Sequence, residues 1–291
     1  MAEPSKTFNR AAEDVGNVQL MEHVNVTVPD QSLAAMFYVT GLGFTRDPYI
    51  DFGTLNMWVN LGDQQFHLPT GSAQVVRGHV GVVVPSLEGL QKRLKFASRG
   101  LGDSHFACVE ADDHLALTCP YGNQVRAYEP ANFSRMDLGM PYVELNVPIG
   151  TAAGIARFYE QVLGCPARLT ADQVEVAMGH NQILRYAETD APLPAYDGHH
   201  IAIYVADFSG PHAWLKDRNL ISEESDQFQY RFQSIVDPDS DPASNEVLFE
   251  LEHEVRSLSH AMYRRPLVNR NPEINFFTYR KGADQFSPAQ R

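Results

Sequence analysis

The sequence predicts an α+β fold built from four copies of one unit, each with a strand, a helix and about three further strands. Three observations support this prediction. A strand-like segment that ends at a turn occurs four times, one helix-end motif occurs twice, and short turns join pairs of alternating apolar runs. The 291 residues are 44% hydrophobic, which is enough for about two domains of ordinary size.

The first strand of each unit is an apolar run that ends at a proline or an alanine six residues after a polar ring residue. These starting residues lie 56 residues apart in the first half of the chain and 58 apart in the second. Such a repeat indicates one supersecondary unit used four times. The four starting residues are His23, His79, Tyr142 and His200.

A helix is predicted after the first strand, and in units one and three it ends in the same motif, F-Y-x-x-x-L-G, at 37–43 and 158–164. Glycine at the end of the motif is typical of a helix C-terminus. Paired strands then follow in every unit, joined by glycine- or proline-containing turns. The predicted strands are 54–61, 64–68, 114–119, 123–128, 174–178, 182–186, 228–236 and 247–253.

Composition excludes several classes of protein. A net charge of −13 disfavours nucleic-acid binding, which needs clustered positive charge. The sequence contains neither a membrane-spanning apolar run nor an apolar signal segment. Three widely spaced cysteines fit free thiols in a reducing compartment, so we expect a cytoplasmic protein that binds neither membrane nor nucleic acid.

The strand-ending V-P motif, the F-Y-x-x-x-L-G motif and the P-Y-G-N turn at 120–123 resemble the vicinal oxygen chelate superfamily. That superfamily includes glyoxalases, bleomycin-resistance proteins and type I extradiol dioxygenases. The resemblance implies that βαβββ modules pair into open, cupped barrels, here two of them. The expected organisation is an N-terminal arm (1–18), a first barrel (19–132), a second barrel (138–255) and a basic C-terminal tail (256–291).

The resemblance implies metal ligands on the first and last strands of each module, because one inward residue from each of four strands can converge inside a cup. In the first barrel these positions are occupied by His23, His67 and His79, with Arg126 at the fourth. Three imidazoles suit Fe(II), Zn(II), Mn(II) or Ni(II), and the arginine would hold a substrate carboxylate or enolate. The alternative is that the arginine marks a site without metal.

In the second barrel the same transfer gives His200, Glu250 and Glu252 as metal ligands. Tyr142 occupies another of the positions, and Arg185, or Leu184 depending on the length of the turn, occupies the last. Glu144, on the same face as Tyr142, is an alternative ligand. The alternative for the whole barrel is a metal-free pocket. His253 is expected either in a proton relay beside the metal or on an exposed strand edge.

The C-terminal segment 256–291 carries seven Lys or Arg against two Asp or Glu. It is expected to wrap back over the acidic body or a neighbouring subunit, and its arginines are alternatively available to an anionic substrate. A homodimer is also expected, since proteins of this family often associate.

The resemblance implies a metal-dependent enzyme, with Fe(II) as the first choice of metal, that acts on a small oxygenated molecule such as an aromatic diol. An extradiol dioxygenase-like reaction is expected. A glyoxalase- or epimerase-like lyase or isomerase, and a metal-free small-molecule binding protein of the resistance type, are the alternatives.

Overall fold

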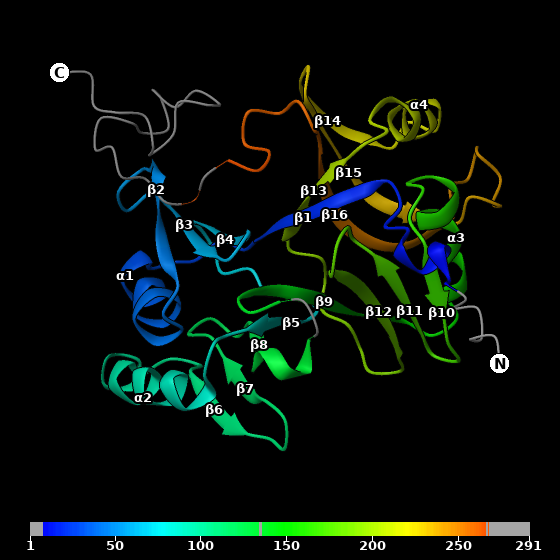
Figure 1. Cartoon of the computed structure of the whole chain (residues 1–291). Helices are drawn as coiled ribbons and strands as arrows, with labels where there is room; N and C mark the ends of the chain where they lie inside the picture. Colours follow the sequence, from blue (N-terminus) through cyan, green and yellow to red (C-terminus); the bar gives the residue numbers. More distant parts are fainter. Residues whose placement is uncertain (1–7, 134–135, 266, 268–291) are drawn as a thin grey trace, which may run out of the picture.

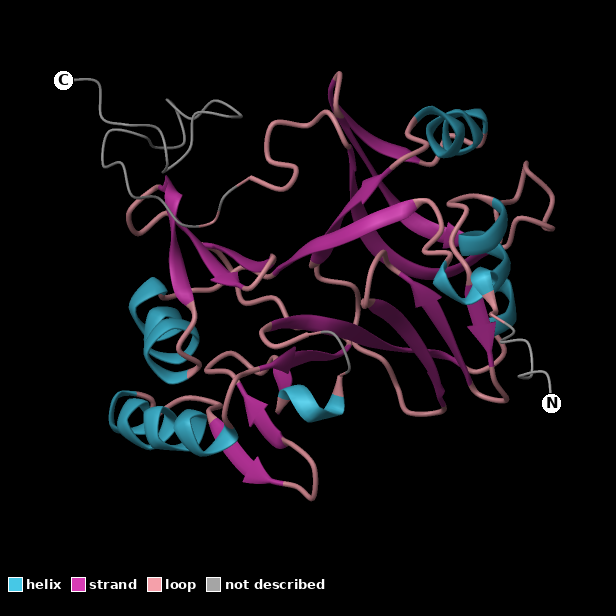
Figure 2. Ribbon diagram, viewed as in Figure 1, coloured by secondary structure: helices cyan, strands magenta, loops and turns pink. Residues whose placement is uncertain are grey.

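The computed structural model describes residues 8–133, 136–265 and 267. Two mixed sheets of eight strands each form the body, and the helices lie at its periphery (Figures 1 and 2). Neither sheet closes into a barrel, since each has two edge strands. In this described part, no helix has the length and apolar character needed to cross a bilayer.

The fourfold repeat is confirmed, because each unit has one strand, a helical segment and three further strands. A short helix, η1 (Arg10–Glu13), precedes the first unit, and another, η4 (Pro130–Asn132), separates the second and third units. Unit one contains β1 (Val18–Asn25), α1 (Gln31–Ala35), η2 (Met36–Gly41), β2 (Thr45–Asp51), β3 (Asn56–Leu61) and β4 (Gln64–Pro69). Unit two contains β5 (Gly78–Val83), α2 (Leu87–Ala97), η3 (Ser98–Gly100), β6 (Ala107–Glu110), β7 (Leu115–Thr118) and β8 (Gln124–Tyr128).

The second half of the chain repeats the plan with longer strands. Unit three contains β9 (Gly139–Pro148), α3 (Ala152–Gln161), β10 (Ala167–Leu169), β11 (Gln173–Ala177) and β12 (Ile183–Thr189). Unit four contains β13 (His200–Val205), α4 (Ser209–Asp217), β14 (Ile221–Asp226), β15 (Gln229–Val236) and β16 (Val247–Ser257). The last strand therefore extends two residues into the segment expected to be tail.

Local chemistry explains the repeated helix motif. The side chain of Asp30 accepts hydrogen bonds from the amides of Ser32 and Leu33 and so caps the N-terminus of α1. The glycines that end the two motifs, Gly43 and Gly164, have φ of +77° and +65°. Glycine adopts this left-handed conformation without steric cost, which is why it closes both helices.

The units pair differently from the expected barrels. One sheet, in the order β14-β15-β16-β13-β1-β4-β3-β2, joins units one and four and is called here the 1/4 sheet. The other, in the order β10-β11-β12-β9-β5-β8-β7-β6, joins units two and three and is called the 2/3 sheet. The expected barrels 19–132 and 138–255 are therefore each divided between the two sheets, and this expectation is wrong.

Close backbone contact explains part of this pairing. In the antiparallel pair β5–β9, a Cβ atom at Gly78 would overlap the carbonyl of Glu144. A Cβ atom at Gly81 would overlap the ring of Tyr142. These two glycines let β9 approach β5, whereas the similar apolar patterns of the four first strands do not distinguish one partner from another.

Buried glutamines connect the two sheets. The Gln182 side chain accepts from the amide of Met21 at 3.1 Å and donates to the carbonyls of Met21 and Met140 at 3.0 Å each. Gln64, at the start of β4, accepts from the amide of Met140 at 2.9 Å. Because these bonds are buried, their polar groups have no water to replace a lost partner.

We therefore expect Gln182→Ala to lower the free energy of unfolding by about 2–4 kcal/mol, since three buried backbone groups lose a partner. Urea unfolding followed by circular dichroism measures this change. Gln124→Ala, which removes an exposed glutamine from β8, is the matched control and should change stability by less than about 0.5 kcal/mol. Equal effects of the two substitutions would contradict the bridging role.

Candidate metal centre

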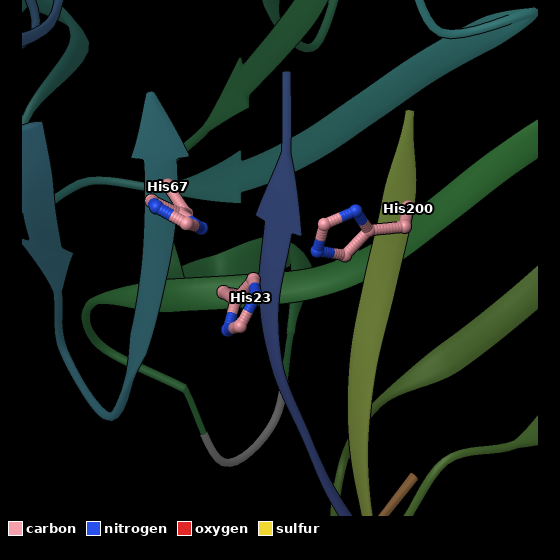
Figure 3. A group of neighbouring side chains, drawn as sticks. All are labelled: His23, His67 and His200. Atoms are coloured by element: carbon pink, nitrogen blue, oxygen red, sulfur yellow. The ribbon is translucent and has the colours of Figure 1, made fainter. Parts of the chain in front are cut away.

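Three histidines from different strands of the 1/4 sheet converge on one point. They are His23 on β1, His67 on β4 and His200 on β13, and one nitrogen from each lies within 4.8 Å of the others (Figure 3). Strand register produces this arrangement: Asn25, two residues beyond His23, pairs with His67 on one side and with His200 on the other. Residues two apart share a face of a sheet, so the three imidazoles project to the same side.

The imidazoles have the properties expected of metal ligands. His23 is fully buried and His200 is 7% exposed, yet Nε2 of each has no hydrogen-bond partner among the described residues. Both ring nitrogens of His67 are likewise unpartnered there. Buried polar atoms normally have a partner. A metal ion would satisfy all three rings at once, and imidazole nitrogen suits Zn, Cu, Fe and Ni.

The surroundings favour the neutral imidazole and orient the rings. Burial lowers the pKa of His23, and it lowers the pKa of His67 well below the usual value. Neutral imidazole is the form that binds metal. The indole of Trp58 stacks on the His67 ring at 3.9 Å between centroids, and a Glu22 oxygen lies 3.2 Å from His23 Nδ1.

Glu254, on β16, occupies the fourth inward position of the 1/4 sheet beside the three histidines; these four positions are called here the first cup. His67 lies two residues beyond Gln65, the register partner of His23, and Glu254 lies two beyond Glu252, the partner of His200. A Glu254 oxygen is 3.6 Å from Nε2 of His200. Although burial raises the pKa of Glu254, the charge of Arg256 and contacts with His200 and Arg231 hold that pKa well below its usual value.

The two glutamates expected as ligands lie earlier on the same strand, β16. Glu252 is 3.5 Å from His200 Nδ1 and forms an ion pair with Arg231 at 2.6 Å. Glu250 instead accepts from Gln233 at 2.8 Å. Two register shifts between β15 and β16 follow the long loop 237–246, so counting from the turn placed the ligand position too early on β16.

His253 does not fit a proton relay or an exposed edge. Its side chain is fully buried and stacks on Phe232 with 4.4 Å between ring centroids. Its Nε2 is 2.6 Å from the hydroxyl of Tyr159, and its Nδ1 is 2.8 Å from the carbonyl oxygen of Leu251. Both nitrogens are used inside the core on the face opposite Glu252 and Glu254, so the role of this residue is packing.

Burial lowers the pKa of His253 to about 4. The unfolded state then binds more protons than the folded state between about pH 6.5 and 4. Stability contributed by the neutral ring is therefore present above pH 6.5 and is lost as the pH falls through this window. We expect His253→Phe to reduce the pH dependence of the unfolding free energy by up to about 1.4 kcal/mol per pH unit there.

Urea unfolding at several pH values between 4.5 and 7 measures that slope. His180→Gln, at a histidine that lines an open cavity, is the control and should leave the slope unchanged. An unchanged slope in His253→Phe would show that this ring is not the buried neutral base described above.

The other expected site residues meet in the 2/3 sheet. Four residues there occupy the strand positions of the three histidines and Glu254 in the 1/4 sheet. In the order His23, His67, His200 and Glu254, the equivalents are His79, Arg126, Tyr142 and Arg185. His79 Nε2 is 3.0 Å from the hydroxyl of Tyr142, so His79 does not join His23 and His67 as expected. Glu144, the alternative ligand, forms an ion pair with Arg185 at 2.9 Å.

The start of the C-terminal segment packs over unit one. This agrees with the expectation that the tail wraps back over the body of the protein. Arg265 forms a buried ion pair with Asp47 on β2. Met262 packs on a small cluster that contains Trp58, the residue stacked on His67. The remainder of the expected tail, 266 and 268–291, lies outside the described residues, as do 1–7 of the expected N-terminal arm.

Comparison with known proteins supports the fold. No family model and no curated protein sequence matches the chain. Among solved structures, glyoxalase I from Zea mays is similar with a TM-score of 0.54 and 14% identity over 81% of this chain and 92% of that one. A putative dioxygenase from Bacillus subtilis gives 0.52 and 14% over 86% and 91%. The chain therefore shares the fold of these two structures, and its repeated strand–helix–three-strand units are those that the sequence predicted.

Proposed function

We propose that this protein is a metal-dependent enzyme of the vicinal oxygen chelate type that acts on a small oxygenated molecule. The observation that carries the proposal is the group of three buried imidazoles with unpartnered nitrogens within 4.8 Å of one another. His23, His67 and His200 would hold the metal, and Glu254 would complete the cup. Similarity to a glyoxalase and to a putative dioxygenase supports this class of chemistry only through the shared fold.

Fe(II) is the first choice of metal, with Mn(II), Zn(II) and Ni(II) as the alternatives, because nitrogen donors beside a carboxylate suit these ions. A metal bound there would act as a Lewis acid toward two adjacent substrate oxygens. The protein residues supply the orientation. Trp58 fixes the His67 ring, Glu22 contacts His23, and guanidinium groups hold Glu254 beside His200.

A cavity of about 580 Å³ lies beside the three histidines, none of which is part of its wall, and is the proposed approach for substrate. Glu22, which contacts His23, is part of its wall, together with Met262 and Arg265 from the segment that packs over unit one. This volume is within the roughly 300–1,000 Å³ of small-molecule sites. The substrate would therefore enter between the two sheets.

We favour an extradiol dioxygenase-like reaction on an aromatic diol over the glyoxalase- or epimerase-like alternative. A proton-transfer mechanism needs a carboxylate that is free to accept a proton. In this site the Glu254 oxygens are paired with Arg231 and Arg256, which makes the carboxylate a weak proton acceptor. Oxygen uptake with catechols should therefore exceed any isomerase activity, and isomerisation without oxygen uptake would contradict this choice.

Metal content tests the site directly. We expect about one divalent metal per chain after anaerobic purification or reconstitution with Fe(II) or Mn(II). We expect a loss of metal affinity of about 100-fold in each of His23→Ala, His67→Ala and His200→Ala. Substitution of residues that only hydrogen-bond to metal ligands already costs about 10–100-fold in metal affinity. Inductively coupled plasma mass spectrometry and metal titration measure both quantities.

His79→Ala is the matched control, because His79 occupies the equivalent strand position in the 2/3 sheet. Its metal content should equal that of the unsubstituted protein. Less than about 0.2 metal per chain in the unsubstituted protein, with no recovery on adding Fe(II) or Mn(II), would exclude both enzyme functions. That result would favour the metal-free binding protein.

A further inference from the structure

The 2/3 sheet forms a second cup whose chemistry differs from that of the first. A cavity of about 500 Å³ opens over it, and its wall includes Arg126, Arg185, Tyr128 and Tyr142. Arg126 occupies the strand position that His67 has in the 1/4 sheet. Tyr142 occupies the position that His200 has there. Guanidinium groups do not bind metal cations, so this cup needs a different ligand.

The floor of the second cup is a connected set of hydrogen bonds. The Tyr128 and Tyr142 hydroxyls are 2.9 Å apart, and the Tyr142 hydroxyl is 3.0 Å from His79 Nε2. Arg185 is bound on two sides, by Glu144 at 2.9 Å and by Glu175 at 3.0 Å. Its guanidinium carbon lies 4.9 Å from the centre of the Tyr142 ring. These side chains are therefore fixed before any ligand binds.

Arg126 is the exception in this cup. It has neither an ion pair nor a hydrogen bond to any residue in the described part of the chain, and it is exposed on β8 at the cavity wall. A guanidinium presents a planar fork of donors that matches a carboxylate. Arg185 is already neutralised by two glutamates, so Arg126 is the guanidinium without an ion pair among the described residues of this wall. The carboxylate of Asp113, which lies in the same wall, is bound to His114.

Part of the remaining wall is apolar or aromatic, and the rest is polar, with Asp113, Asn132, Asn181 and Gln182. Phe133, Met136 and Pro141 line the cavity beside the rings of Tyr128 and Tyr142, and the Tyr128 and Phe133 rings are 5.3 Å apart. This apolar and aromatic part of the wall favours a flat, apolar ligand body. Among the described residues of the wall, a phosphate dianion would find one unpaired cation, and one is enough for a monocarboxylate.

We propose that the cup of the 2/3 sheet binds a small aromatic carboxylate, with Arg126 holding the carboxylate and the tyrosine-lined wall holding the ring. This site is separate from the proposed metal centre and does not depend on it. It gives a function to the cavity of the 2/3 sheet, where arginine and tyrosine occupy positions that hold candidate metal ligands in the 1/4 sheet.

Benzoate is the probe, and isothermal titration calorimetry with the full-length protein measures its binding. We expect Arg126→Ala to weaken benzoate binding by about tenfold to 100-fold, and Arg126→Lys to weaken it less. Phenol, which has the ring without the carboxylate, and inorganic phosphate should each bind at least about tenfold more weakly than benzoate. Arg99→Ala, at an exposed arginine on η3 in the same unit, should leave binding unchanged.

The double variant His23→Ala/His200→Ala separates this proposal from the proposed function, because it removes the metal centre and should retain benzoate binding. Circular dichroism of each variant checks folding. The proposal would be overturned if the unsubstituted protein did not bind benzoate, or if Arg126→Ala bound benzoate as tightly as the unsubstituted protein does. It would also be overturned if phosphate bound more tightly than benzoate, or if the double histidine variant lost benzoate binding. Failure of the metal measurements alone would leave it standing.

Discussion

The candidate metal centre depends on one interaction, the antiparallel pairing of β1 with β13. These strands are almost 180 residues apart in sequence, and their hydrogen bonds place His200 across from Asn25 and beside His23. His67 comes from β4 on the other side of β1. Loss of the β1–β13 pairing would leave two histidines on one side and one on the other, so the three-histidine group exists only because the first and last units share a sheet.

The same scaffold carries two different chemistries. In both sheets the central pair of first strands and the strands beside it present four inward positions (Figure 1). In the 1/4 sheet these positions hold three imidazoles and a carboxylate. In the 2/3 sheet they hold two guanidinium groups, one imidazole and one phenol, and the last two are hydrogen-bonded to each other. A backbone repeat thus sets where side chains converge, whereas the residues at those positions decide what is bound.

The repeat, the helix motifs and most inward positions could be predicted from the sequence, because strand alternation and short turns are local properties. The strand positions of His67, Arg126 and Arg185 could be counted from the sequence, since each follows a short hairpin turn. Glu254 was missed because the loop before β16 is long and the β15–β16 register shifts twice. The partner of each first strand was also missed, since it depends on close contacts such as Gly81 against Tyr142.

Charge near the three histidines bears on the substrate that the proposed enzyme would take. Glu254 and Glu22 are buried, but both are paired with Arg256, and Arg231 also pairs with Glu254. Buried ion pairs contribute little net stability, whereas removal of one partner is costly, so this network is better explained by orientation of the site. Because burial lowers the pKa of His23 and His67 and the carboxylates are already paired, a divalent ion there would keep most of its charge. Anionic oxygens of a bound diol or enediol would supply the missing negative charge, which favours a substrate with two adjacent oxygens.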